Sequence, residues 1–103
     1  MCGRYFIAAD SENFEIANII EQVNSLFKNT QELSEMKIGE IFPTDIVPIV
    51  TAENPSLMKW GFPRFDGKGQ LINARLETAG EKPMFRRAFN KTRCLVPATN
   101  YFE

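Results

Sequence analysis

The sequence predicts an α+β fold in which strands outnumber helices and pair mainly antiparallel. Along the 103 residues a strand pattern is followed by a helix, several strands, a short helix and further strands. Strands joined by short turns favour antiparallel pairing, because a parallel pair needs a long crossover connection. No internal repeat, low-complexity tract or linker divides the chain, so we expect part of one domain.

The first forty residues predict one strand and the longer helix. Residues 1–8 are rich in β-forming side chains and predict the strand. Asp10 or Ser11 is expected to cap the helix, because a short side-chain oxygen accepts the free N–H groups of the first turn. Apolar residues at helical spacing continue the helix to about Lys28, and residues 29–40 show little pattern.

The middle of the chain predicts three strands. Residues 45–51 form the first, and Pro48 within them favours an edge strand or a bulge. Residues 57–62 form the second. The Asp-Gly-Lys-Gly sequence at 66–69 predicts a turn into a third strand at 71–75, which makes a hairpin.

The last part predicts a short helix and two strands. Pro83 suits the first turn of a helix over 84–91. Strands are expected at 93–97 and 100–103, with Cys94 buried and inert among apolar neighbours. The pattern stops inside the last strand without a turn or polar tail, so we expect a fold that is incomplete.

Composition is that of an ordinary globular protein, with 44% hydrophobic and 24% charged residues. No apolar run approaches the ~20 residues that cross a bilayer. The first residues resemble neither a signal peptide nor a transit peptide, so a cytoplasmic location is expected, with nucleoid association if the protein is bacterial.

Charge is nearly balanced, at a formal net charge of −1. Nucleic-acid binding usually accompanies a clear basic excess, and overall composition lacks one. Basic residues do gather within twenty positions, namely Arg75, Arg86, Arg87, Lys91 and Arg93. A local basic patch is one interpretation, and a solvated helix face is the favoured one.

The sequence contains two cysteines, no Cys-x-x-Cys pair and no histidine. A disulfide is not expected in a cytosolic chain. The lack of histidine excludes a Ser-His or Cys-His dyad within this sequence and removes the commonest zinc ligand. No metal and no cofactor are therefore expected.

Cys2 carries the most specific chemistry. Removal of Met1 would leave an α-amine and a thiol on one residue, with reference pKa values of about 7.7–8.0 and 8.5. The amine can attack an aldehyde to give a Schiff base, and the thiolate can close a thiazolidine ring on it. If Met1 stays attached, the amine is locked in a peptide bond. On residue chemistry alone, the favoured alternative is a small buried side chain at the start of a strand.

Four blocks of sequence occur together in a set order. They are MCGRY at 1–5, KWGFP at 59–63, INARLET at 72–78, and a final block with Phe-Arg at 85–86, RCLVPA at 93–98 and YFE at 101–103. Together they resemble the N-terminal part of the SOS response-associated peptidase (SRAP) family. The resemblance implies capture of abasic sites in single-stranded DNA as a covalent DNA–protein crosslink.

The resemblance also implies roles for individual residues. Cys2 would be the nucleophile, Asn73 would hydrogen-bond around the adduct, and Glu103 would hold the α-amine and move protons. Arg4 and Arg75 would bind phosphates beside the abasic site, because a guanidinium fork matches phosphate oxygens.

These residues also have simpler interpretations. Asn73 can be a turn residue, Glu103 a charged terminal residue, and Arg4 and Arg75 can form surface salt bridges. Trp60 would be a base-stacking platform, although a lone Trp in so short a chain is slightly more often a core residue.

Two departures from the family pattern lead to alternative functions. The family's second half, with a catalytic histidine, has no counterpart in this sequence. Open sheet edges and apolar surface are then expected, and with them self-association. A thiol (auto)peptidase that releases the residue before Cys2 is one alternative function. A non-catalytic half-domain is the other.

Overall fold

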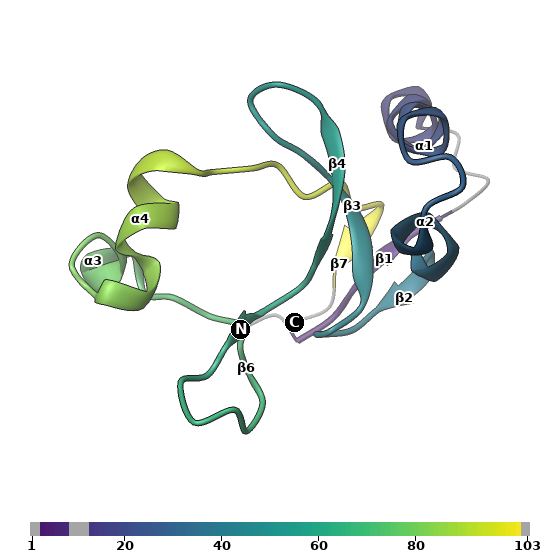
Figure 1. The fold of residues 1–103 in the computed structure, drawn as a ribbon. Helices are drawn as coiled ribbons and strands as arrows, with labels where there is room; N and C mark the ends of the chain where they lie inside the picture. Colours follow the sequence, from purple (N-terminus) through teal and green to yellow (C-terminus); the bar gives the residue numbers. More distant parts are fainter. Residues whose placement is uncertain (1–2, 9–12, 102–103) are drawn as a thin grey trace.

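The computed structural model describes residues 3–8 and 13–101 and confirms the α+β class, with antiparallel sheets (Figure 1). The helices are α1 (Phe14–Leu26), α2 (Gln31–Glu35), α3 (Leu76–Ala79) and α4 (Pro83–Lys91). The strands are β1 (Tyr5–Ile7), β2 (Gly39–Ile41), β3 (Ile46–Val50), β4 (Pro55–Lys59), β5 (Phe62–Pro63), β6 (Gln70–Leu71) and β7 (Asn100–Tyr101).

Three small sheets organise these strands. The first has the order β2-β1-β7, so β1 is central and joins strands from both ends of the described chain. The second pairs β3 with β4, and the third is the β5–β6 hairpin around the predicted turn. Pro48 pairs in register with Leu57 without a bulge. It is tolerated because β3 belongs to a two-stranded sheet, as the edge-strand prediction requires.

The core lies between α1 and the first two sheets. Its residues are Tyr5, Ile7, Ile16, Ile41, Val47 and Ile49, with Ile20, Ile38 and Trp60 packed against them. Tyr5 and Ile7 point to this core because alternate side chains of a strand share one face. Helix α1 adds the buried face of Ile16 and Val23.

The cap of α1 differs from the predicted one. Asn13 occupies the N-cap, and its Oδ1 accepts hydrogen bonds from the N–H groups of Glu15 (3.0 Å) and Ile16 (3.1 Å). The expected caps, Asp10 and Ser11, lie outside the described residues. Asn is as good an N-cap as Asp or Ser, so the helix begins where the next such residue stands.

Several short elements were not predicted. The polar stretch 29–40 contains α2 and most of β2, and the expected strand at 71–75 ends at Leu71 before α3 begins. The expected strand at 57–62 is divided, because Gly61 takes a φ of +107° between β4 and β5. The helix predicted over 84–91 includes Pro83 at its first position.

The strand predicted at 93–97 is wrong. Only Leu95 pairs with the sheet, through two hydrogen bonds with Val50 of 2.8 and 2.9 Å. Cys94 is consequently exposed, and the prediction that it is buried is also wrong. An apolar run predicts burial only if another element covers it, and the described part of the chain leaves Cys94, Leu95 and Val96 exposed.

The chain forms an open arch rather than a filled globule. After β4 it runs out through the β5–β6 hairpin to α3 and α4, and residues 92–98 return to β3 (Figure 1). The radius of gyration is 14.3 Å, against about 12.8 Å for a compact domain of this length. No helix among the described residues is long and apolar enough to cross a membrane.

Candidate functional site

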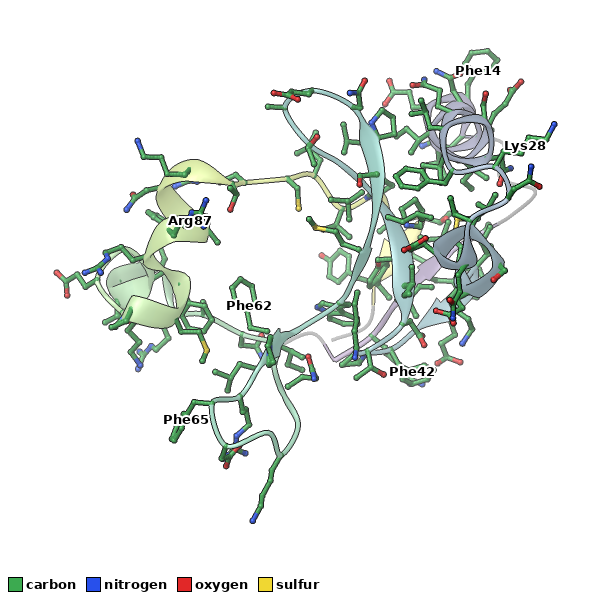
Figure 2. The ribbon with its side chains drawn as sticks, viewed as in Figure 1. Phe14, Lys28, Phe42, Phe62, Phe65 and Arg87 are labelled. Atoms are coloured by element: carbon green, nitrogen blue, oxygen red, sulfur yellow. The ribbon has the colours of Figure 1, made fainter. Side chains whose placement is uncertain are left out.

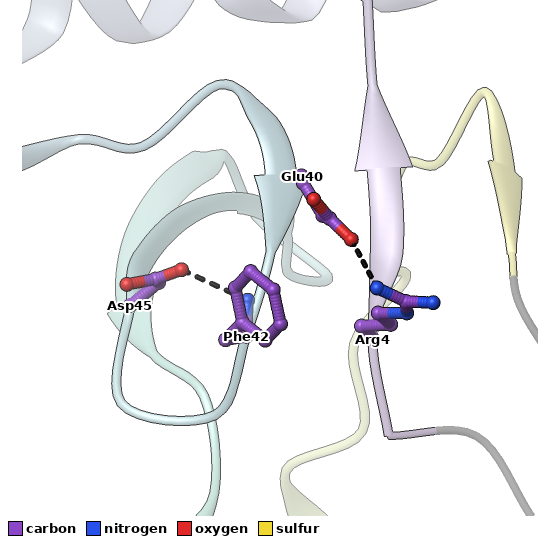
Figure 3. Close-up of polar contacts among 4 residues, drawn as sticks. All are labelled: Arg4, Glu40, Phe42 and Asp45. Atoms are coloured by element: carbon purple, nitrogen blue, oxygen red, sulfur yellow. Dashed lines mark hydrogen bonds and ion pairs between the residues drawn. The ribbon is translucent and has the colours of Figure 1, made fainter.

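Arg4 directly precedes β1 and forms an ion pair with Glu40 of β2. Its Nη1 lies 2.5 Å from the Glu40 Oε1 (Figure 3). Glu40 pairs with Phe6, so Arg4 reaches it as a diagonal neighbour across the two strands. Both side chains are almost half exposed. An ion pair this exposed contributes about 0–1 kcal/mol, so it holds the guanidinium only weakly.

Tyr5 is the buried polar group of this region. Only 5% of the residue is exposed, and its hydroxyl has no hydrogen-bond partner in the structure as described. Burial raises the pKa of Tyr5 from 10.0 to about 12, and the nearby charges of Asp45 and Cys94 raise it further in the same direction. The hydroxyl is therefore a neutral donor throughout the physiological range.

Trp60 packs on Tyr5 at the end of β4. The two ring centroids are 5.3 Å apart at an interplanar angle of 66°, an edge-to-face contact. The backbone of Trp60 is fixed as well, because its N–H donates to Asp45 and its carbonyl accepts from Thr44, both at 2.9 Å. Trp60 is half-buried against the core, which agrees with its interpretation as a core residue. Its role in base stacking stays a prediction.

Gly61 makes the turn after Trp60 possible. Its φ of +107° is a conformation that L side chains rarely adopt. A Cβ atom at this position would also lie 2.8 Å from the Gln70 Oε1 and 3.0 Å from the Gln70 Cβ. The strand β6 therefore approaches the backbone here as only glycine permits.

Asn73 lies beside Trp60 at an apolar cavity. The cavity has a volume of about 250 Å³ and is walled by the segment 60–62, the chain after β6, and helices α3 and α4. Phe62 and Phe85 close one side with ring centroids 5.2 Å apart. Among the described lining residues, Asn73 contributes the side-chain amide. The structure thus brings Trp60 and Asn73, two of the predicted site residues, to one cavity.

Arg75 stands two residues after Asn73, at the start of α3. Its Nε lies 3.5 Å from the Glu77 Oε2, with both side chains largely exposed. The ion pairs of Arg4 and Arg75 thus involve different carboxylates, as the salt-bridge interpretation of each residue predicts. Neither pair buries its guanidinium.

The basic residues around α4 form a solvated face. Arg86, Arg87 and Lys91 are exposed on the helix. Arg93 is engaged with the helix end, because its Nε donates to the Phe89 carbonyl at 2.6 Å and its guanidinium lies 4.2 Å from the centroid of the Phe89 ring. This arrangement matches the favoured interpretation of the basic cluster.

Cys2 and Glu103 lie outside the described residues. Their described neighbours are close together, because Tyr5 of β1 pairs with Tyr101 of β7 in antiparallel register. Residues 3–8 and 13–101 contain no group of three or more His, Cys, Asp or Glu that could hold a metal ion.

Sequence reasoning missed the unpartnered hydroxyl of Tyr5. The alternation of Tyr5 with Ile7 in a strand could have predicted its burial. No local pattern reports whether a buried hydroxyl finds an acceptor, because the acceptor would come from a distant part of the chain.

Comparisons with known proteins place these observations in a family context. A family model described as SOS response associated peptidase (SRAP) matches residues 1–103. The chain is 32% identical to "Abasic site processing protein YobE" of Bacillus subtilis (strain 168) over 118 residues, covering 100% of this chain and 48% of that protein. It is 33% identical to "Abasic site processing protein YoqW" of Bacillus phage SPbeta over 118 residues, covering 100% of this chain and 47% of that protein. The chain spans about half the length of these curated relatives. No solved structure matches it.

Proposed function

The chain belongs to the SOS response associated peptidase (SRAP) family, and from this premise we propose that it takes part in processing abasic sites in DNA. Family membership confirms the resemblance that the four sequence blocks indicated. The relatives' printed names supply the substrate class. Because this chain spans about half of each relative, the activity is proposed for the chain and not carried over as its own property.

The proposed reaction joins Cys2 to the aldehyde of an abasic site in single-stranded DNA. After Met1 is removed, the α-amine adds to the aldehyde carbon and water leaves, which gives an imine. The thiolate then bonds to the same carbon, and the imine nitrogen takes up a proton to complete a thiazolidine. The net change is the loss of one water, and Glu103 would shuttle the protons.

The pairing of β1 with β7 is the observation that carries this proposal. Cys2 and Glu103 are 101 positions apart in the sequence. Tyr5, three residues after Cys2, and Tyr101, two residues before Glu103, are nonetheless direct partners in the sheet. A nucleophile at one end of the chain and a carboxylate at the other are therefore joined to adjacent strands, which is what proton transfer between them needs.

The remaining predicted residues suit the DNA around that point. Trp60 and Asn73 share the apolar cavity, so a stacked base and an amide hydrogen bond are compatible there. Arg4 and Arg75 hold only exposed ion pairs, which a phosphate can replace at small cost. These roles are part of the proposal.

Crosslinking of a synthetic oligonucleotide tests the reaction. The chain, with removal of Met1 verified by intact mass, is mixed with single-stranded DNA that carries one abasic site. We expect a covalent adduct with the summed mass less one water. Cys2→Ala, an undamaged oligonucleotide and a tetrahydrofuran analogue without the aldehyde should give none. A chain that lacks Met1 and still forms no adduct would contradict the proposal.

The arginines are tested by the salt dependence of noncovalent binding to the tetrahydrofuran oligonucleotide. Loss of one phosphate contact lowers the slope of log affinity against log salt by about 0.7 for a single strand. Arg4→Gln and Arg75→Gln should each show this change. Arg64→Gln is the matched control, because Arg64 is also exposed and ion-paired, to Asp66 at 2.9 Å in the β5–β6 hairpin.

A further inference from the structure

An apolar hollow lies on the inner side of β4. We call it the β4 hollow. It has a volume of about 370 Å³, and its lining includes Tyr5, Met58, Trp60, Phe62, Cys94 and Val96. Met58 and Val96 are 54% and 53% exposed, although both are large apolar side chains. The Phe62 ring points into the space between α4 and the strands β3 and β4 (Figure 2).

The surface area of the whole chain supports a missing contact. The accessible surface is 7638 Å², whereas a folded monomer of 11.8 kDa is expected to expose about 5,900 Å². A contiguous apolar patch on such a surface normally marks a binding interface. The excess is large enough for an interface of standard size, about 800 Å² on each side.

The Tyr5 hydroxyl gives independent support for an occupant. The residue lines the β4 hollow, is 95% buried, and leaves its O–H without an acceptor among the described residues. An unsatisfied buried donor is costly, and native structures rarely keep one. The simplest remedy is an acceptor delivered by whatever fills the hollow.

The length of the relatives indicates which molecule this is. All of this chain aligns with 47–48% of each relative, so each has a further half with no counterpart here. A half that belongs to the same family domain must cover the apolar surface of the first half, since neither half buries a full core alone. DNA is a poor occupant, because the lining of the hollow is almost wholly apolar.

We infer that the β4 hollow seats a second polypeptide, equivalent to the half of the relatives that this chain does not match. Apolar side chains of that polypeptide fill the space against Met58 and Val96. One of its backbone or side-chain oxygens accepts a hydrogen bond from the Tyr5 hydroxyl. The inference rests on family membership and geometry, and it does not depend on the crosslinking chemistry.

A binding experiment tests the inference. The half of YobE that this chain does not match is produced as a separate polypeptide, and its affinity is measured by titration calorimetry. We expect a 1:1 complex. Tyr5→Phe should weaken it about three- to tenfold through loss of one hydrogen bond. Val96→Asp should weaken it by at least about tenfold, because it places a charge against apolar surface.

Two further measurements keep the outcomes separate. Phe65→Asp is the matched control and should leave the affinity unchanged, since Phe65 is 95% exposed in the β5–β6 loop, away from the hollow (Figure 2). Alkylation of Cys94 should slow about tenfold or more in the complex, because Cys94 lines the hollow. Failure to bind the YobE half would overturn the inference. So would a dimer of this chain alone that Val96→Asp dissociates, because a second copy would then occupy the hollow.

Discussion

At the scale of single residues, Tyr5 shows a conflict between two requirements. Its ring belongs to the core and packs on Trp60, which favours burial. Its hydroxyl loses water on folding and gains no partner among the described residues. Leaving such a donor unsatisfied costs about 1–3 kcal/mol. The residue therefore stabilises the free chain through its ring and destabilises it through one oxygen.

Tyr5→Phe should stabilise the free chain. The substitution keeps the ring and removes the unsatisfied hydroxyl, so we expect the free energy of unfolding to rise by about 1 kcal/mol at neutral pH. Urea denaturation measures it. Tyr101→Phe is the control and should change stability by less than about 0.5 kcal/mol, because Tyr101 is 70% exposed. A destabilised Tyr5→Phe would show that the hydroxyl has a partner.

The pKa of Tyr5 predicts a loss of stability at alkaline pH. The folded value is about 12 and the ordinary value is 10.0. Between these values the unfolded chain releases the proton while the folded chain keeps it, so stability is intact below pH 10 and falls above it. At pH 11 the loss is about 1.4 kcal/mol. We expect this loss in the wild-type chain relative to Tyr5→Phe, and equal pH profiles for the two would contradict it.

At the scale of elements, the turn between β4 and β5 decides the path of the chain. Gly61 combines a positive φ with the close approach of Gln70, so β4 ends and the chain departs toward the β5–β6 hairpin. Phe62 is thereby placed to contact Phe85 of α4. One glycine thus links the sheet region to the helical region that carries the cavity around Asn73.

Gly61→Ala should destabilise the chain more than Gly67→Ala. Both positions have positive φ, which costs alanine about 1–2 kcal/mol. Only Gly61 also has Gln70 atoms within 3.0 Å of a new Cβ, whereas nothing lies within 4 Å at Gly67. We expect a loss of about 2–3 kcal/mol for Gly61→Ala and about 1 kcal/mol for Gly67→Ala, measured by urea denaturation. Equal losses would mean that β6 moves aside freely.

At the scale of the whole molecule, the arch keeps apolar surface in contact with water. The described residues include ten exposed large hydrophobic side chains, and several of them border the β4 hollow. The excess surface and the large radius of gyration have the same cause, because the space inside the arch is not filled. Stability of the free chain is therefore expected to be low for its length.

The free chain should bind the dye ANS through the β4 hollow. Exposed, contiguous apolar surface is what this dye detects. We expect Met58→Asp combined with Val96→Asp to reduce ANS fluorescence at least about twofold, with the far-UV circular dichroism unchanged. Phe14→Asp and Phe65→Asp serve as controls, because both side chains are exposed on other surfaces (Figure 2). Equal reductions in all variants would locate the dye elsewhere.

The sequence by itself determined the fold class, the family and the longer elements. Helices α1 and α4 have enough residues for an apolar stripe or a Pro at the first turn to be recognised. The turn at 66–69 was equally local, because glycines at positive φ make it. The candidate site residues came from the four sequence blocks, since their roles depend on chemistry at fixed positions.

Only the tertiary structure decided which of these residues meet and what remains uncovered. The elements α2, α3 and β2 have three to five residues, too few for a period to be read, and contacts with distant segments stabilise them. Local spacing likewise could not show that Cys94 is exposed, that Tyr5 lacks an acceptor, or that β7 pairs with β1. Each depends on residues far away in the sequence, and burial of a side chain is a property of the neighbours that cover it.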